Sequence, residues 1–337
     1  MKSITFEEHY VVDEIQQETL NNVEFDDNGV PLKAMLQALS EETGFDNDDV
    51  LESDENHDKR LRFMDAQNVQ YQVLSYGNTP PSLVTDEKSI ELCRRANDKL
   101  YDYIQQYPDR FLGFATLPIN EPEAAAEELT RCIKKLNFKG ALIAGRTNNQ
   151  FLETSDFEIV FATAADLDAP IYVHPAVLPA KNYQDYYASD AYDDVVASTF
   201  ASFGFGWHMD VGIQAVRLVL SGLFDRHPNF KLIIGHWGEF VPFFLDRMDQ
   251  ALVARDLKKP VSQYFKDHFY ITPSGMLTQP QFDMVRHYFG DDHILYSADY
   301  PYIQPETLGA FLEELDVDQE TKEKIAYGNA ERLLNLK

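Results

Sequence analysis

Glu7 and His9 are the first residues of the chain that could do chemistry together. They belong to ITFEEHY, in which Ile, Thr and Phe are typical of a buried strand. Successive side chains of a strand point to opposite faces, so Glu7 and His9 share one face and Glu8 points the other way. A carboxylate beside an imidazole is half of a metal site. The same residues also fit an edge strand that runs out into solvent, so this stretch alone leaves both interpretations open.

Metal-binding and acid–base residue types also follow three later apolar runs. His174 ends IYVH, His236 ends KLIIGH, and Asp299 follows ILYSA. Alone, each histidine fits a hydrogen-bonded core residue and Asp299 fits a turn. Four strand ends with such residues are hard to attribute to turns. Two imidazoles with two carboxylates suit Zn²⁺, Mn²⁺ or Fe²⁺ and lack the thiolates of structural zinc sites. The candidate ligands are Glu7, His9, His174 and Asp299.

The segments that would position these side chains alternate between strands and helices. Apolar runs predict strands over residues 3–10, 69–77, 110–118, 139–145, 170–174, 230–236, 268–273 and 293–298. Amphipathic patterns predict helices over residues 87–107, 121–136, 155–168, 241–256, 279–289, 305–315 and 319–336. Alternation implies parallel strands, and eight such units imply a closed α/β barrel of the (β/α)8 TIM type. We expect one domain over residues 1–337.

In such a barrel the C-terminal ends of the strands meet at one mouth, which would gather the candidate ligands. Two long loops are predicted at the same mouth, over residues 11–57 and 175–210. The second loop is rich in Tyr, Phe and Gly and places Trp207 beside His208. It fits an aromatic lid over an aromatic substrate and a subunit contact equally well.

Charge and composition exclude several classes of partner. The formal net charge of −27 argues against nucleic acid and anionic membranes, which would repel the chain. No signal-peptide segment and no run of about 18 apolar residues is visible, so we expect a cytoplasmic protein. The cysteines Cys93 and Cys132 cannot form a disulfide framework of the secreted type.

Motifs along nearly the whole chain carry a family resemblance: FEEHY, RLRFMDAQNV, DRFLGFATLP, KGALIAG, IYVHP, RLVLSGLFDRHPNFKLIIGHWGEFVPF, SADYPY and GNAERLL. They resemble the metal-dependent non-oxidative decarboxylases of the amidohydrolase superfamily. This ACMSD-like group includes γ-resorcylate, 2,3-dihydroxybenzoate and 5-carboxyvanillate decarboxylases. The Glu-x-His start is the specific feature, because hydrolytic members more often begin His-x-His and many carry a carboxylated lysine. The predicted fourth strand, KGALIAG, has its lysine only at the beginning.

The resemblance implies a metal centre with an acid–base pair beside it. Its metal would be one divalent ion, Mn²⁺ or Zn²⁺, and its substrate a small aromatic carboxylic acid. His236 and Glu239 would form the acid–base pair. Resembling enzymes are dimers or tetramers, so a homodimer or homotetramer is expected. The implied ligands are Glu7, His9, His174 and Asp299.

Four further residues are candidates for contacts with the substrate. The resemblance suggests Arg60 and Arg247 for the substrate carboxylate or for a neighbouring subunit, and Tyr302 as an aromatic residue of the pocket wall. Asn78, in SYGNTPP after the second predicted strand, is a candidate polar contact.

The chemistry expected is decarboxylation of an ortho-hydroxy aromatic acid such as a dihydroxybenzoate. Asp299 would protonate the ring carbon that bears the carboxylate, which avoids an aryl carbanion. A hydrolase of a lactone or amide is the alternative, with Asp299 as general base for a metal-activated water. No feature favours a hydratase. A further alternative is a barrel that binds metal without catalysis. Against it, His236 and Glu239 would have no role in a purely structural metal site.

Overall fold

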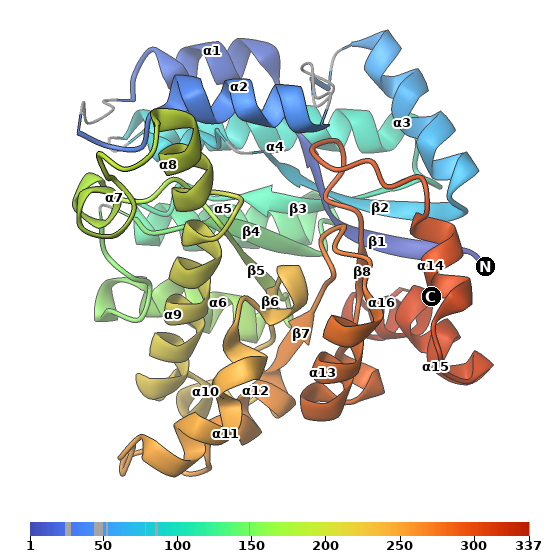
Figure 1. Cartoon of the computed structure of the whole chain (residues 1–337). Helices are drawn as coiled ribbons and strands as arrows, with labels where there is room; N and C mark the ends of the chain where they lie inside the picture. Colours follow the sequence, from blue (N-terminus) through green and yellow to red (C-terminus); the bar gives the residue numbers. More distant parts are fainter. Residues whose placement is uncertain are drawn as a thin grey trace.

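Eight parallel strands form the centre of the molecule (Figure 1). The computed structural model describes residues 1–23, 28–43, 50–51, 53–77, 79–84, 87–147 and 149–336. The strand order is β7-β6-β5-β4-β3-β2-β1-β8. The strands are β1 (Ser3–Tyr10), β2 (Val69–Tyr76), β3 (Phe111–Thr116), β4 (Gly140–Ala144), β5 (Ile171–His174), β6 (Leu232–Ile234), β7 (Phe269–Ile271) and β8 (Tyr296–Ser297).

The sheet closes on itself between β7 and β8. β1 pairs with both β2 and β8, and a parallel bridge joins Ile271 at the end of β7 to Ile294 just before β8. The Leu295 amide donates to the Ile271 carbonyl at 2.9 Å. The predicted (β/α)8 barrel of the TIM type is therefore confirmed.

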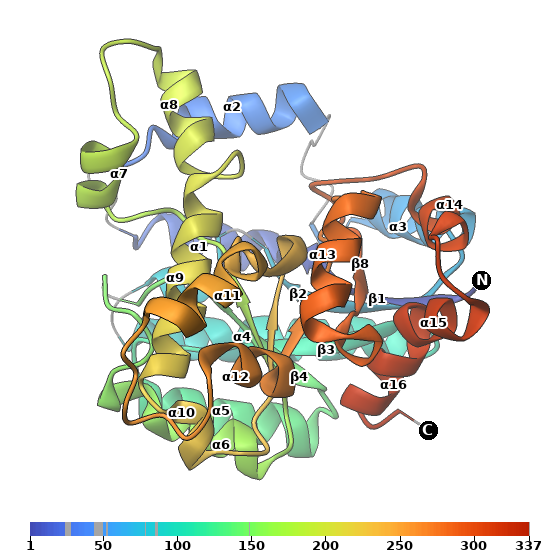
Figure 2. The same ribbon diagram turned by 60° about the horizontal axis from the view of Figure 1, so that its bottom comes forward.

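Helices cover the outside of the barrel (Figures 1 and 2). After β2 they are α4 (Lys88–Gln106), α5 (Pro122–Lys135), α6 (Glu158–Asp166), α9 (Gly206–Leu220), α10 (Leu223–Arg226), α11 (Val241–Ala251), α12 (Val261–His268), α13 (Gln279–Phe289), α14 (Leu308–Glu314), α15 (Gln319–Glu323) and α16 (Asn329–Leu333). Most lie within the predicted ranges, but α9, α10 and α12 were not predicted, and the helix predicted over residues 319–336 is divided into α15 and α16. The helix predicted over residues 241–256 ends at Ala251, where Leu252 turns to an extended backbone.

The hydrophobic core of the barrel has two parts. One lies between the strands and the surrounding helices. The other fills the inside of the barrel with inward-facing strand residues such as Phe6, Phe114 and Tyr172, and Leu333 of α16 joins it. Because side chains pack the interior, the mouth at the C-terminal ends of the strands is where a site can form.

The two segments predicted as long loops contain helices, so that prediction is wrong. Residues 11–57 include α1 (Asp13–Leu20), α2 (Leu32–Thr43) and the start of α3 (Asp54–Ala66), and residues 175–210 include α7 (Ala180–Tyr186), α8 (Asp194–Ala201) and the start of α9. Figure 2 shows α2 lying against α8. Apolar residues from both segments, with Trp207, form one small core, and this burial stabilises helices that are too short to form alone.

Among the described residues, every helix is too short or too polar to span a membrane.

Candidate metal centre and active site

β1 brings Glu7 and His9 into the barrel mouth through a break in its pairing. The register with β2 shifts between Thr5 and Glu8, and Glu7 takes a left-handed backbone with φ 57°. All of Ser3–Tyr10 is buried, which excludes the edge-strand interpretation. The break therefore belongs to the site, as bulges beside active sites often do.

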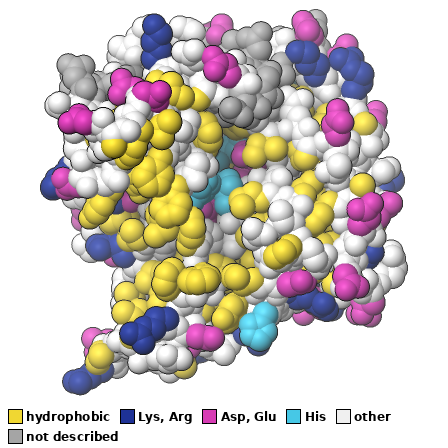
Figure 3. Space-filling view, viewed as in Figure 1, with side chains coloured by type: hydrophobic (Ala, Val, Ile, Leu, Met, Phe, Trp, Pro, Cys, Tyr) yellow, Lys and Arg dark blue, Asp and Glu magenta, His cyan; other side chains and the backbone are white. Residues whose placement is uncertain are grey.

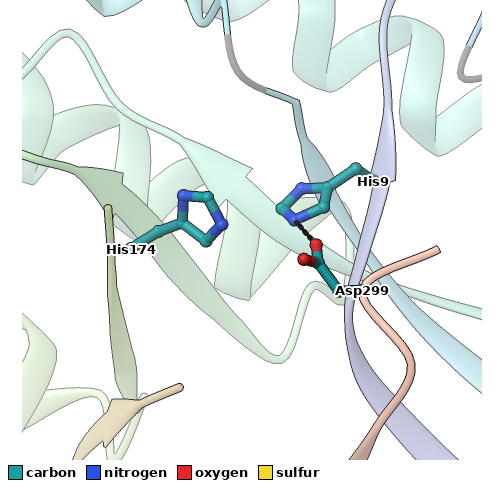
Figure 4. A group of neighbouring side chains, drawn as sticks. All are labelled: His9, His174 and Asp299. Carbon is teal, nitrogen blue, oxygen red and sulfur yellow. Dashed lines mark ion pairs between the residues drawn. The ribbon is translucent and has the colours of Figure 1, made fainter. Parts of the chain in front are cut away.

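His174 and Asp299 reach the same point from other strands. His174 is the last residue of β5 and Asp299 follows β8. His9 Nε2 lies 3.1 Å from Asp299 Oδ1, and the His9 and His174 rings are 4.8 Å apart (Figure 4). Glu7 Oε1 lies 3.6 Å from His174 Nε2. The barrel thus brings all of the predicted ligands together.

The atoms that face the centre of this group fit a divalent metal. Glu7 Oε1, His9 Nε2 and Asp299 Oδ1 are buried without a hydrogen-bond partner, an arrangement that is unfavourable unless a cation satisfies them. His174 Nδ1 lies 2.7 Å from the Pro175 carbonyl, which it can reach only as a donor, so its Nε2 keeps a lone pair for a metal. Donors about 2.1 Å from one tetrahedral ion lie about 3.4 Å apart. Two of the pairs, His9 with Asp299 at 3.1 Å and Glu7 with His174 at 3.6 Å, are close to this spacing. His9, His174 and Asp299 offer donor atoms that all lie within 4.8 Å of one another.

Burial controls the charges in this centre. It raises the pKa of Glu7 to about 8 and that of Asp299 to about 7, and nearby His236 only partly opposes this. Burial lowers the pKa of His9 to about 3 and that of His174 well below its usual value. The imidazoles are therefore neutral, as a metal requires, and the carboxylates keep protons that a cation would displace.

Beside the ligands, Glu239 lies between two imidazoles. His236 Nδ1 donates to Glu239 Oε1 at 2.8 Å and His208 Nδ1 donates to Oε2 at 2.9 Å. Burial alone would raise the pKa of Glu239, but the two histidines lower it to about 2. Burial alone would lower the pKa of His208 and of His236. The negative charge of Glu239 helps to outweigh this, and the pKa of both histidines lies above its usual value. His236 Nε2 points toward Asp299, 4.0 Å from Oδ2.

Of the group formed by His208, His236 and Glu239, His208 is the residue for which the sequence predicted no role. Its only signal was its position beside Trp207, whose indole N–H donates to His208 Nε2 at 3.1 Å. His208 comes from helix α9, and close packing brings it to the site. A Cβ atom on Gly212, one turn further on, would lie 2.3 Å from the Glu239 carbonyl oxygen, so only glycine allows this approach.

Backbone strain is concentrated in the same residues. Glu7, His236, Glu239 and Asp299 all have left-handed backbones, with φ from 47° to 67°. Such conformations cost about 1–3 kcal/mol each and are typical of functional sites. Gly235 adds a close approach, because a Cβ there would lie 2.8 Å from Glu7 Oε1.

A cavity of about 160 Å³ opens beside the ligands. Histidine side chains are visible in the hollow near the centre of the face in Figure 3. An apolar cavity of about 150 Å³ is enough to hold one benzene ring. The end at the metal centre carries His174, His236 and Asp299. The other walls include Phe203, Trp207, Met276, Tyr302 and Ile303.

The remaining predicted contacts lie in different places. Tyr302 is in the cavity wall, 5.2 Å from the His9 ring. Arg60 is buried behind the centre, where it donates to Gln72 and to the His9 carbonyl. Arg247 is exposed on α11. Asn78 lies outside the described residues.

Comparisons with known proteins agree with this geometry. An amidohydrolase family model matches residues 29–336. The decarboxylase orsB of Emericella nidulans is 35% identical over 291 residues, which cover 83% of this chain and 85% of the relative. A Staphylococcus aureus protein that is described by family alone, as an amidohydrolase, is 56% identical, with a TM-score of 0.90 over 100% of both chains.

A second solved structure is a dihydroxybenzoic acid decarboxylase from Polaromonas sp. with bound manganese and an inhibitor, 2-nitroresorcinol. It is 28% identical, with a TM-score of 0.82 over 99% of this chain and 97% of the other. The resemblance that the motifs indicated is confirmed. A match along most of its length, on a barrel whose mouth carries these ligand types, shows that the chain belongs to the amidohydrolase family.

Proposed function

We propose that this protein is a metal-dependent non-oxidative decarboxylase, a carboxy-lyase, of an ortho-hydroxy aromatic acid such as a dihydroxybenzoate. The observation that carries the proposal is the position of Asp299. It lies 3.1 Å from His9 in the metal centre and also lines a cavity of the size of one aromatic ring. The named decarboxylases among the relatives support the same reaction.

The proposed ligands favour a first-row divalent ion. A cation held by Glu7, His9, His174 and Asp299 would act as a Lewis acid that binds the substrate carboxylate and the ortho phenolate oxygen, fixing the ring. Manganese in the Polaromonas structure supports Mn²⁺. Zn²⁺ suits the same nitrogen and oxygen donors and is kept as the second choice.

Asp299 is the proposed proton donor. A metal that binds Asp299 would displace its proton, so this role requires Asp299 to take up a proton again when the substrate binds, and the burial that raises its pKa favours the protonated form. Its proton goes to the ring carbon that bears the carboxylate. The bond from this carbon to the carboxylate then breaks, the electron pair restores the aromatic ring, and CO₂ leaves.

His236 is proposed to accept the proton of the substrate's phenol group. In its neutral form, with Nδ1 donating to Glu239, His236 could accept the phenol proton at Nε2 and then hold the phenolate as an imidazolium paired with Glu239. His208 is proposed to help hold Glu239 in place, because it occupies the second carboxylate oxygen. The aromatic and aliphatic wall that includes Tyr302 would pack against the ring. Arg247 and Asn78 stay predictions of the sequence.

Isotope labelling tests this reaction against the hydrolase alternative. In D₂O the decarboxylase should place one deuterium on the ring carbon that lost the carboxylate, and in H₂¹⁸O the aromatic product should gain no labelled oxygen. NMR and mass spectrometry of the product measure both. Incorporation of ¹⁸O into the product would instead indicate hydrolysis by water, with Asp299 as general base.

A homodimer or homotetramer is proposed for the assembly. Exposed phenylalanines support it: Phe200 contacts Phe205, which contacts Phe240, and Phe243 lies beside Phe244. Large exposed apolar patches mark contact surfaces. Yellow side chains beside the central hollow are visible in Figure 3. A cytoplasmic location stays a prediction of the sequence.

A further inference from the structure

Glu8 is a buried carboxylate that no proposed step uses. It lies between the ligands Glu7 and His9 in β1, and its side chain is completely buried (0% exposed). A carboxylate is rarely buried to this extent without specific partners. Its contacts therefore indicate why it is there.

Those contacts surround Asp299. Glu8 Oε1 accepts the Ala298 amide at 3.0 Å, and Oε2 accepts the Tyr300 amide at 3.1 Å. These are the two residues on either side of Asp299, which itself has a left-handed backbone with φ 67°. Glu8 thus holds both ends of the strained turn that presents Asp299.

A second arm of the network holds His9. Gln72 Nε2 donates to Glu8 Oε2 at 3.4 Å, and Gln72 Oε1 accepts from Arg60 at 3.1 Å. Arg60 donates in turn to the His9 carbonyl at 2.5 Å. All three side chains in this chain of contacts are buried.

Two direct contacts connect the His9 side of the network to Tyr300, on the Asp299 side. The His9 amide donates to the Tyr300 carbonyl at 2.6 Å, and the Arg60 guanidinium lies 4.6 Å from the centre of the Tyr300 ring. Taken together, these contacts link the backbone of His9 to the backbone around Asp299.

We propose that Glu8, Gln72 and Arg60 form a positioning unit that sets the distance between His9 and Asp299 and so sets the affinity of the metal centre. The inference rests on the proposed function, because it needs that centre to bind metal. It gives Arg60 a role behind the ligands, through the His9 carbonyl, in place of a direct contact with substrate.

Glu8→Gln tests the unit with almost no change in shape. A carboxylate can accept from both amides, but a glutamine must turn an NH₂ group toward one of the two backbone N–H groups. The turn around Asp299 should shift, and Mn²⁺ should bind about 10–100-fold more weakly, as for other residues that orient metal ligands. Calorimetric titration of the purified, metal-stripped protein with Mn²⁺ measures this without relying on activity.

Glu128→Gln is the matched control. Glu128 is also buried and hydrogen-bonded, to Asn97 and Arg131, but it lies on α5 and contacts no ligand. It should lose thermal stability and keep the Mn²⁺ affinity of the wild type. A loss of affinity in Glu8→Gln alone supports the positioning role.

Two results would count against different parts of the account. If the wild type binds Mn²⁺ and Glu8→Gln binds it equally well, the positioning unit is wrong. If the wild type itself binds no Mn²⁺, the proposed metal centre fails first. Should Glu8→Gln not fold, Gln72→Met decides: it leaves both amide contacts intact, and a loss of up to about tenfold supports the unit, while wild-type affinity overturns it.

Discussion

In the proposed reaction Asp299 acts both as a metal ligand and as an acid, and its surroundings suit both roles. It faces His9 on one side and His236 on the other, at 3.1 Å and 4.0 Å. Asp299→Asn keeps the shape but removes the transferable proton, so we expect kcat to fall by about 10²–10⁴-fold. Decarboxylation rates at saturating Mn²⁺ measure this, with metal content checked for each sample. A variant that holds metal and decarboxylates at the wild-type rate would remove Asp299 from the reaction.

The raised pKa values of Glu7 and Asp299 predict a pH-dependent metal affinity. In the metal-free protein these pKa values are about 8 and about 7, so both groups are protonated at pH 6 and must release protons when a metal binds. His9 has none to release, because its pKa is about 3. Mn²⁺ affinity should therefore rise from pH 6 to pH 8.

Calorimetry in buffers of different ionisation enthalpy counts the protons released. Close to two protons per metal are expected at pH 6, and fewer at pH 8. An affinity that is constant over this range, with no proton release, would show that the carboxylates are already ionised before the metal binds.

At the residue scale, the strand ends pointed to the candidate ligands that the structure brings together but not to His208. Glu7, His174 and Asp299 could be found because each follows an apolar run and the barrel brings such ends together. His208 lies on a helix, and its place depends on the packing of α9 against Glu239. A pattern in one sequence does not reveal that packing.

Among the helices, α9 packs closely against Glu239, and Gly212 permits this approach. Gly212→Ala would put a Cβ 2.3 Å from the Glu239 carbonyl oxygen, so α9 or the turn of His236 and Glu239 has to move. We expect kcat to fall at least about tenfold, with a lower melting temperature. Steady-state kinetics and thermal unfolding measure the two effects.

Gly328→Ala is the control for a glycine change without a clash. The nearest atom to a Cβ at Gly328 is the Glu323 carbonyl oxygen at 3.6 Å, an ordinary contact. This variant should be as active as the wild type. Equal activity of Gly212→Ala would show that the approach of α9 does not hold the pair in place.

The elements themselves were largely predictable from periodicity. β1 and α13 match their predicted ranges, because alternating or amphipathic apolar residues run to their ends. β6, β7 and β8 are shorter than predicted, because only two or three residues of each predicted range form the strand. The helices in residues 11–57 and 175–210 were missed because they are short and stabilised by packing on each other.

For the molecule as a whole, the exposed phenylalanines predict self-association. They form a phenylalanine patch that consists of Phe200, Phe205, Phe240, Phe243 and Phe244. Phe243 is 69% exposed on α11, and Phe243→Lys places a charge in the patch. The oligomer should dissociate or weaken in light scattering combined with size exclusion. Leu36→Lys, at a 54% exposed position on α2, is the control and should leave the mass unchanged. A wild type that is monomeric at all concentrations would contradict the proposal.

The fold and the family of the whole chain followed from its pattern of strands and motifs. Substrate identity did not, because the cavity walls come from several segments, such as Phe203, Met276 and Tyr302. Their arrangement depends on tertiary packing and not on any local periodicity.

Release of CO₂ from ortho-hydroxy aromatic acids, with added Mn²⁺ and again after chelation, tests the central claim most directly. A panel that includes 2,6- and 2,3-dihydroxybenzoate should show release that requires metal and returns when Mn²⁺ is restored. No release from any member, by protein shown to hold metal, would contradict the proposed decarboxylase.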